Sequence, residues 1–91
     1  MECILIEVWV ITRVDWDSHD TEFIGAAESL EVAVAHIKRL DYHDRWGKLT
    51  QTSPNCEEYK IDPMFEAINH RIYPCHEPYI ITKMPLIRKE V

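Results

Sequence analysis

The run of residues 3–14 constrains the fold more than any other part of the chain. It is rich in Val, Ile, Trp and Thr, which favour β-strands. Its even-numbered positions are almost all apolar, whereas Glu7 and Arg13 interrupt the odd-numbered ones. Apolar residues on both faces are typical of a central strand. We therefore expect a central strand whose even face meets the main core.

The odd-numbered face of this strand also needs a cover. It carries Leu5, Trp9 and Ile11. A second helix or the segment 79–87 would cover these side chains within the chain. The alternative is a partner chain, because an apolar patch with polar interruptions is typical of an interface. A symmetric homodimer is the simplest such arrangement, so these three residues are the predicted oligomer interface.

The remaining elements follow from turn, cap and periodicity patterns. A polar cluster at 15–20 predicts a turn, and Ser29 is a suitable N-cap for a helix with apolar residues at helical spacing. Asp62 followed by Pro63 is typical of a helix start. The expected elements are strands at 3–14, 21–27, 57–61 and 79–84 and helices at 29–42 and 63–70. This β-β-α-β-α-β order predicts a single α+β domain over 1–91, an antiparallel-dominated sheet with a helix packed on one face.

Charge and composition narrow the class of partner. The 91-residue chain has a net charge of −6, and residues 1–45 hold 10 acidic and 4 basic side chains. An acidic chain without a basic stripe is a poor ligand for nucleic acid, so we expect no direct nucleic-acid binding and favour a basic protein surface as the partner.

No window of the sequence reaches the roughly 20 apolar residues of a membrane span. Glu2 stands where a signal peptide is basic, and three cysteines without framework spacing suit a reducing compartment, so the sequence predicts a cytoplasmic, non-membrane protein.

The loop at 15–20 is the predicted partner-binding site. It places Trp16 among Asp15, Asp17 and Asp20. The pattern fails as a calcium loop because Asp20 occupies the position that requires glycine. An exposed Trp flanked by carboxylates is typical of a recognition hot spot, and a solvated hairpin turn is the simpler alternative.

The Cys and His residues do not predict chemistry. Cys56, His70, Cys75 and His76 lack the paired spacing of structural zinc sites, and no activating pattern surrounds either cysteine. We therefore predict no metal, no cofactor and no catalytic residue, and interpret the chain as a non-enzyme.

The segment 43–48 offers an alternative, a small-ligand or nucleotide site. His43, Arg45, Trp46 and Lys48 would contact the ligand, with Trp46 stacking and the basic groups facing phosphate. The simpler interpretation is a helix end with Trp46 packed on the core.

Several of these segments together resemble small uncharacterised proteins encoded by bacteria and their phages. They are residues 8–12, the acidic turn, Phe23-Ile24-Gly25, the Ser-capped helix and residues 58–61, within about 1–62. The resemblance implies a phage accessory or anti-defence role, exerted by binding a host factor or sequestering a small molecule. We therefore expect a cytosolic binding protein, in the host cytoplasm if phage-encoded, that inhibits or regulates a protein partner; an oligomeric ligand-sequestering protein is the alternative.

Overall fold

The computed structural model describes residues 3–15, 18, 20–41, 43, 45–75 and 77–89. Within them the class is α+β, with one helix and with strands paired antiparallel. The elements in chain order are β1 (Cys3–Val14), β2 (Thr21–Ala27), α1 (Leu30–Leu40), β3 (Arg45–Trp46), β4 (Thr50–Gln51), β5 (Glu58–Ile61), β6 (Pro63–Glu66), β7 (Ile72–Pro74) and β8 (Tyr79–Lys89).

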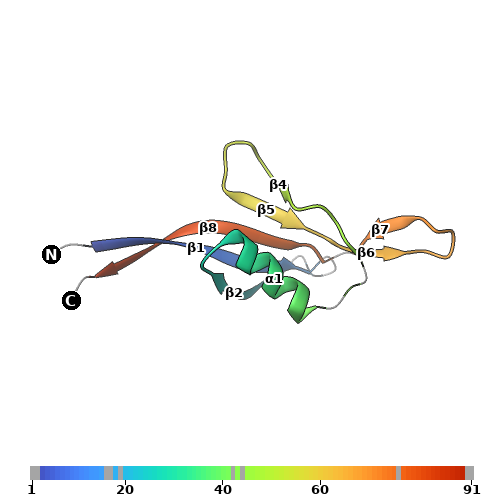
Figure 1. Cartoon of the computed structure of the whole chain (residues 1–91), viewed down its shortest axis with the longest axis horizontal. Helices are drawn as coiled ribbons and strands as arrows, with labels where there is room; N and C mark the ends of the chain where they lie inside the picture. Colours follow the sequence, from blue (N-terminus) through green and yellow to red (C-terminus); the bar gives the residue numbers. More distant parts are fainter. Residues whose placement is uncertain are drawn as a thin grey trace.

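The first strand is central, as its composition predicts. A five-stranded sheet has the order β2-β1-β8-β5-β4, and β1 pairs with β8 along almost its whole length. Strand β2 pairs with β1 only from Trp9 to Val14, and β5 pairs with β8 only from Tyr79 to Thr82. The outer parts of β1 and β8 therefore pair only with each other, as a two-stranded ribbon that carries both chain ends (Figure 1).

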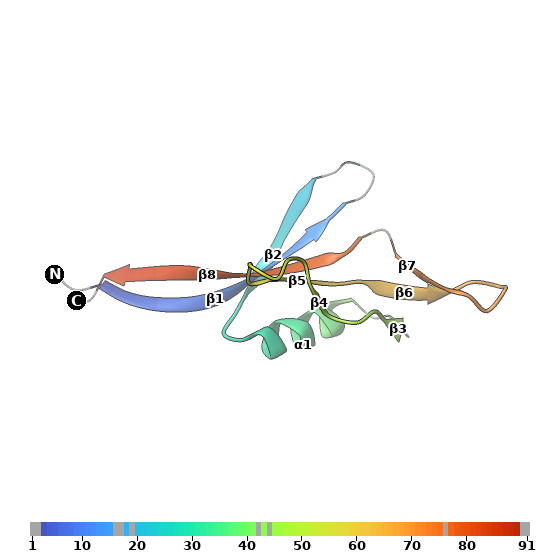
Figure 2. The same cartoon turned by 90° about the horizontal axis from the view of Figure 1, so that it is seen from above.

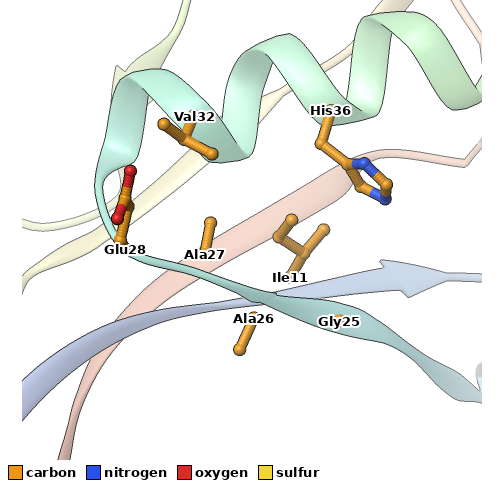
Figure 3. A pocket seen from close by; sticks show the side chains of 7 residues that line it. All are labelled: Ile11, Gly25, Ala26, Ala27, Glu28, Val32 and His36. Atoms are coloured by element: carbon orange, nitrogen blue, oxygen red, sulfur yellow. The ribbon is translucent and has the colours of Figure 1, made fainter.

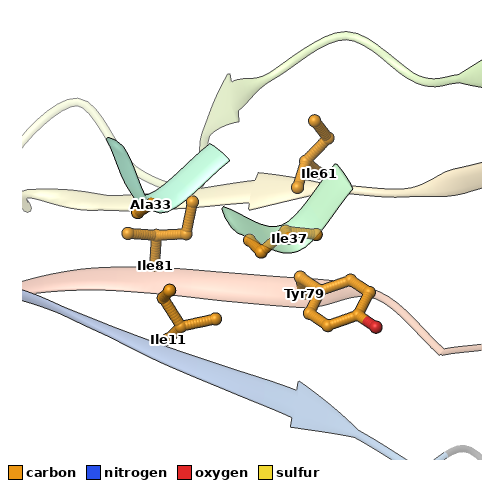
Figure 4. Close-up of a cluster of buried hydrophobic side chains, with 6 residues drawn as sticks. All are labelled: Ile11, Ala33, Ile37, Ile61, Tyr79 and Ile81. Atoms are coloured by element: carbon orange, nitrogen blue, oxygen red, sulfur yellow. The ribbon is translucent and has the colours of Figure 1, made fainter. Parts of the chain in front are cut away.

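Helix α1 forms where the Ser29 cap and the apolar spacing predict it. The Ser29 hydroxyl accepts a hydrogen bond from the Val32 N–H at 3.2 Å, which satisfies one free donor of the first turn. The helix ends at Asp41, whose N–H donates to the Ile37 carbonyl at 3.0 Å. Its buried side chains, Ala33 and Ile37, lie against the sheet (Figure 4).

The core lies on the odd-numbered side of β1, which reverses the predicted orientation of the strand. The buried hydrophobic side chains among the described residues are Ile11, Ala33, Ile37, Ile61, Tyr79 and Ile81. Ile11 pairs with Ile81 across β1 and β8, and both lie beneath α1 (Figure 4). The prediction that Ile11 lies in an oligomer interface is therefore wrong, because its side chain is 1% exposed within the single chain.

The other two predicted interface residues lie farther along β1. Trp9 is half-buried and packs against Tyr59 with ring centroids 5.9 Å apart. The Lys83 ammonium lies 5.8 Å from the Trp9 ring centre and 3.0 Å from a Glu7 carboxylate oxygen. Leu5 lies in the terminal ribbon, and its side chain is outside the described part. The chain's own residues thus contact one side of Trp9.

The predicted second helix at 63–70 is wrong. Residues Pro63–Glu66 form β6, which turns back into β7 and pairs on its other edge with β3. Pro63 stands at the start of the strand, where a missing N–H is tolerated, and its carbonyl accepts from the Cys75 N–H at 2.7 Å. The long connection at 43–56 likewise contains the short strands β3 and β4. In the described part of the chain, one helix and eight strands in two sheets therefore replace the predicted six-element order.

The final strand is longer than the sequence predicts. Residues 79–84 were expected to form it, with Pro85 as its end or as an edge marker, whereas β8 continues to Lys89. Pro85 pairs opposite Glu7, beyond the end of β5. The molecule is elongated, 62 Å by 26 Å by 26 Å, with the terminal ribbon at one end and the β6–β7 hairpin at the other (Figures 1 and 2).

Candidate functional site

The acidic loop at 15–20 closes the β1–β2 hairpin. The Asp15 N–H donates to the Asp20 carbonyl at 2.9 Å, and the Asp20 N–H donates to the Ser18 hydroxyl at 3.3 Å. The two aspartates therefore lie at the base of the loop, as the turn pattern predicts. Trp16 and Asp17, the centre of the predicted partner site, lie outside the described residues. The recognition role of this loop stays a prediction.

Three of the four alternative ligand residues at 43–48 contact other parts of the chain. Trp46 packs against the core, with its ring centre 6.2 Å from that of Tyr79 and 5.4 Å from that of His43. The Arg45 guanidinium lies 3.6 Å from a Glu66 carboxylate oxygen, and Lys48 is exposed. Trp46 packs on the core, as the simpler interpretation expects, but the segment is not a helix end, because α1 ends at Leu40 and Arg45–Trp46 form strand β3.

A polar cluster that the sequence analysis missed ties the end of α1 to β8. The Tyr79 hydroxyl donates to Asp41 Oδ2 at 3.0 Å, and His43 Nε2 lies 3.1 Å from Asp41 Oδ1. Burial of the phenol raises the pKa of Tyr79, and the Asp41 carboxylate raises it further. The phenol therefore stays protonated as a donor at neutral pH. These contacts fix where the chain leaves the helix, because Asp41 directly follows α1.

Cys75 directly follows β7, and the carboxylate of Asp41 is one of three that act on its thiol. Burial raises the pKa of its thiol, and the negative charges of Asp41, Asp62 and Glu77 raise it further. Because the thiolate is the reactive form, this environment keeps Cys75 a weak nucleophile.

A pH titration can test this environment directly. In a variant in which serine replaces Cys3 and Cys56, we expect the Cys75 thiolate to form at higher pH in the folded chain than in the same chain unfolded by urea. The raised pKa means that the neutral thiol is favoured in the fold and that this contribution to stability is lost as pH rises through the folded pKa. The ultraviolet absorbance of the thiolate measures both curves. A folded midpoint at or below the unfolded one would contradict the assigned environment.

A half-open hollow of about 350 Å³ lies between β2 and α1. Ile11 and Ala27 point up from the sheet into it, Val32 and His36 face it from the helix, and Ala26 points away on the opposite side of the sheet (Figure 3). Its lining is mainly apolar, with one imidazole and one carboxylate, that of Glu28, at its edge. The hollow lacks the converging polar groups that orient a small ligand.

The β6–β7 hairpin carries the most exposed large apolar side chain of the described residues, Ile68, together with three other exposed ones. Ile68, at its tip, is fully exposed, and Phe65 is 46% exposed. Ile72 and Tyr73 on the returning strand are also exposed. The Phe65 and Tyr73 rings pair across the two strands and stack, with centroids 5.7 Å apart and planes 29° from parallel.

The turn that presents Ile68 is closed by its own backbone. The Ala67 N–H donates to the Arg71 carbonyl and the His70 N–H to the Ala67 carbonyl, each at 2.9 Å. The Asn69 side chain accepts from the Arg71 N–H at 3.1 Å, and His70 has a φ of 63°. Asn and His adopt this left-handed conformation more readily than most residues. The pair Asn69-His70 between two apolar runs is the sequence pattern that could have predicted the hairpin.

The comparisons with known proteins add no function to this geometry. Family models, curated proteins and solved structures give no match to the chain. The resemblance to small bacterial and phage proteins thus stays a prediction.

The described residues contain no group of three or more His, Cys, Asp and Glu side chains placed to hold a metal ion. Cys56, between β4 and β5, and His70, at the hairpin tip, lie in separate parts of the molecule (Figure 1), and His76 is outside the described residues. No helix in the described part of the chain has the length and apolar character needed to cross a bilayer.

Proposed function

We propose that this chain is a non-enzymatic binding protein that recognises a protein partner through the β6–β7 hairpin. The supporting observation is a hairpin that projects from the molecule (Figures 1 and 2) and carries four exposed large apolar side chains on its two faces and its tip. They are Phe65, Ile68, Ile72 and Tyr73. Exposed apolar groups gathered on one projection are typical of a protein-interaction site.

The energetics favour Ile68 as the anchor. Burying an isoleucine side chain fully contributes about 1.5–3 kcal/mol, and Ile68 contributes nothing to the chain's own core because it is fully exposed. Phe65 and Tyr73 are held by their mutual stacking, so a partner that covers them immobilises little that is free. The hairpin is therefore largely preorganised for binding.

The charges beside the hairpin indicate the chemistry of the partner. Glu66 lies 3.6 Å from the Arg45 guanidinium and 3.5 Å from His70 Nδ1, and Arg71 adds a further positive charge at the turn. The apolar side chains thus have neighbours of both charge signs. A matching surface is an apolar groove with a polar rim, rather than a strongly basic patch.

Binding of the hairpin in the partner's groove would regulate the partner. A hairpin inserted there would exclude whatever the groove normally binds, so the protein would act as an inhibitor without a catalytic step. The acidic loop at 15–20 fits a second contact, because its carboxylates would speed association with a partner that is basic near the groove. The small-ligand alternative has less support, since Trp46 packs inside the chain and Arg45 pairs with Glu66.

Site-specific photocrosslinking tests the proposal. A benzoyl-phenylalanine replaces Ile68 in one variant and the exposed helix residue Glu31 in a control. Both are irradiated in an extract of the cells that naturally contain the protein. We expect one discrete protein adduct from position 68 and none from position 31. Equal adducts from both positions, or none from either, would reject the hairpin as the recognition element.

A further inference from the structure

The face of the five-stranded sheet that is turned away from α1 lies open. We call it the open face and define it by the described side chains that share the even register of β1. They are Ile6, Val8, Val10 and Thr12 of β1, Ile80, Thr82 and Met84 of β8, Phe23 and Ala26 of β2, and Glu58 and Lys60 of β5. Figure 3 shows the division at one point, where Ala26 points away from the helix and Ala27 points toward it.

No described element packs over this face. Helix α1 and the core side chains Ile11, Ile37 and Tyr79 lie on the other side of the sheet (Figure 4). Seen from above, α1 and β3 lie on one side of the β1–β8 strands, and only the β1–β2 hairpin rises on the opposite side (Figure 2). The open face is therefore bounded at one end by that hairpin, and its central side chains, such as Val8, Val10 and Ile80, are half-buried within the single chain.

The centre of the open face is apolar and uncharged. On β1 and β8 its side chains are aliphatic, threonine or methionine, and the charged Glu58 and Lys60 occupy the β5 border. Phe23 is 67% exposed and Met84 47% exposed. An apolar centre with charge confined to the rim is the anatomy of a specific interface.

The edges of the same sheet are unsuited to strand pairing, so a partner is expected on the face. Strand β2 is irregular opposite Ile11 and Thr12, where Ile24 is the extra residue, and β4 has two residues. The Lys83 N–H points toward β5, where it donates to the Glu57 carbonyl at 2.9 Å. Because residues two apart point the same way, Pro85 stands at the free edge beyond β5, without an N–H to offer. Bulges, short strands and proline are the usual protections of an edge.

We propose that a second copy of this chain covers the open face, forming a two-fold dimer in which two sheets pack face to face. A sheet with an apolar face on each side needs a second layer on each, and α1 supplies only one. The opposite charges of Glu58 and Lys60 at the rim admit a self-complementary contact, in which the glutamate of one copy meets the lysine of the other. Within the chain, Glu58 also accepts from the Thr52 hydroxyl at 2.8 Å, and Lys60 also pairs with Asp62 at 3.7 Å. The excess acidity of the chain is absent from the apolar centre, so no unpaired charge is buried there.

The size of the open face agrees with a weak but specific dimer. From Ile6 to Thr12 it extends about 20 Å along β1, and the five strands span about 19 Å across. In flat projection this rectangle measures at most about 380 Å², below the roughly 800 Å² that each partner buries in a standard interface, so the contact is a small one. We therefore expect a dimer with a dissociation constant of about micromolar order.

Sedimentation equilibrium tests the dimer and the face together. Wild-type protein is expected to show twice the 10.8 kDa chain mass at concentrations well above micromolar and to dissociate on dilution. Val10→Lys, at the centre of the open face, should give a monomer with unchanged circular dichroism, because the new charge meets water there. The matched control Ile68→Lys, on the hairpin, should leave the dimer intact.

A second variant keeps the test decisive if Val10→Lys fails to fold. Val10→Thr preserves shape and β-propensity and should raise the dimer dissociation constant about tenfold, since a hydroxyl is then buried against an apolar surface. An unchanged constant for Val10→Thr, or a wild type that stays monomeric at about a hundred times micromolar concentration, would overturn the proposal. The proposal would also be overturned if a different protein, and not a second copy of this chain, bound the open face. None of these outcomes bears on crosslinking at Ile68, so the dimer and the hairpin function can fail separately.

Discussion

The Ile81→Ala variant is expected to lose about 3–4 kcal/mol of unfolding free energy, more than any single surface change. Ile81 is completely buried between Ile11 of β1 and Tyr59 of β5, its neighbours across the two adjacent strands. Truncation to alanine removes apolar contacts and leaves a cavity that α1 and the sheet fill only in part. Large-to-small changes at such positions cost about 2–5 kcal/mol.

This loss is large because the whole domain is marginally stable. A chain of this length has about 5–14 kcal/mol of unfolding free energy. The measurement is urea unfolding of both proteins at one protein concentration, followed by circular dichroism. Ile72→Ala is the matched control, because the same atoms are removed from a side chain that is 40% exposed on the hairpin. Equal losses in the two variants would show that Ile81 is not a core residue.

The elements near the start of the chain were predictable because their signals are local. The β-branched run of β1, the polar turn after it and the Ser29 cap each act within a few residues. The bond from the Val32 N–H to the Ser29 hydroxyl is the local contact that the cap pattern anticipates. Strand β1 and helix α1 therefore form close to the predicted bounds.

The choice of core face on β1 was not predictable, because it depends on where one helix lies. Helix α1 has 11 residues and covers about 16 Å, whereas the 12 residues of β1 extend about 40 Å. Only a short part of β1, around Ile11, can lie under the helix. Glu7 and Arg13, which make the odd face look mixed, lie on either side of that covered part, Glu7 near the middle of the strand and Arg13 near its end. Alternation alone cannot indicate which side of a two-sided apolar strand receives the helix.

The hairpin at 63–74 was missed because two local patterns compete there. Asp62 and Pro63 are typical of a helix start, and Met64, Phe65 and Ile68 have helical spacing. Residues 63–66 form a strand instead, because they pair with β3 on one edge and with β7 on the other. That pairing joins segments distant in sequence, which outweighs local propensity. The turn residues Asn69 and His70 were the available signal against the helix.

The candidate site was unpredictable for a related reason. Exposure of Ile68 and stacking of Phe65 on Tyr73 exist only once the segment is a hairpin. In the predicted helix, Phe65 and Ile68 would have formed an apolar face covering β1. The type of an apolar residue does not indicate whether it is buried in the core or exposed to a partner. Because the segment was predicted as a helix, these residues were assigned to the core.

The second large effect is expected for Ile68→Asp, which should weaken partner binding by a factor of about 30 or more. An anchor side chain at the centre of an interface commonly contributes 2 kcal/mol or more, and a carboxylate in its place must also be desolvated. The fold should be unaffected, because the Ile68 side chain is fully exposed. The measurement is calorimetric titration of the crosslinked partner, once purified, with wild-type and variant protein.

Val32→Asp is the matched control for this experiment. It makes the same kind of change at an exposed apolar side chain, in the first turn of α1, where an added acidic group interacts favourably with the helix dipole. We expect its affinity to equal that of the wild type. Trp16→Ala combined with Asp15→Asn and Asp20→Asn addresses the acidic loop, and should mainly slow association if the loop is a second contact. Full affinity in Ile68→Asp together with loss in the loop variant would transfer the recognition site from the hairpin to the loop.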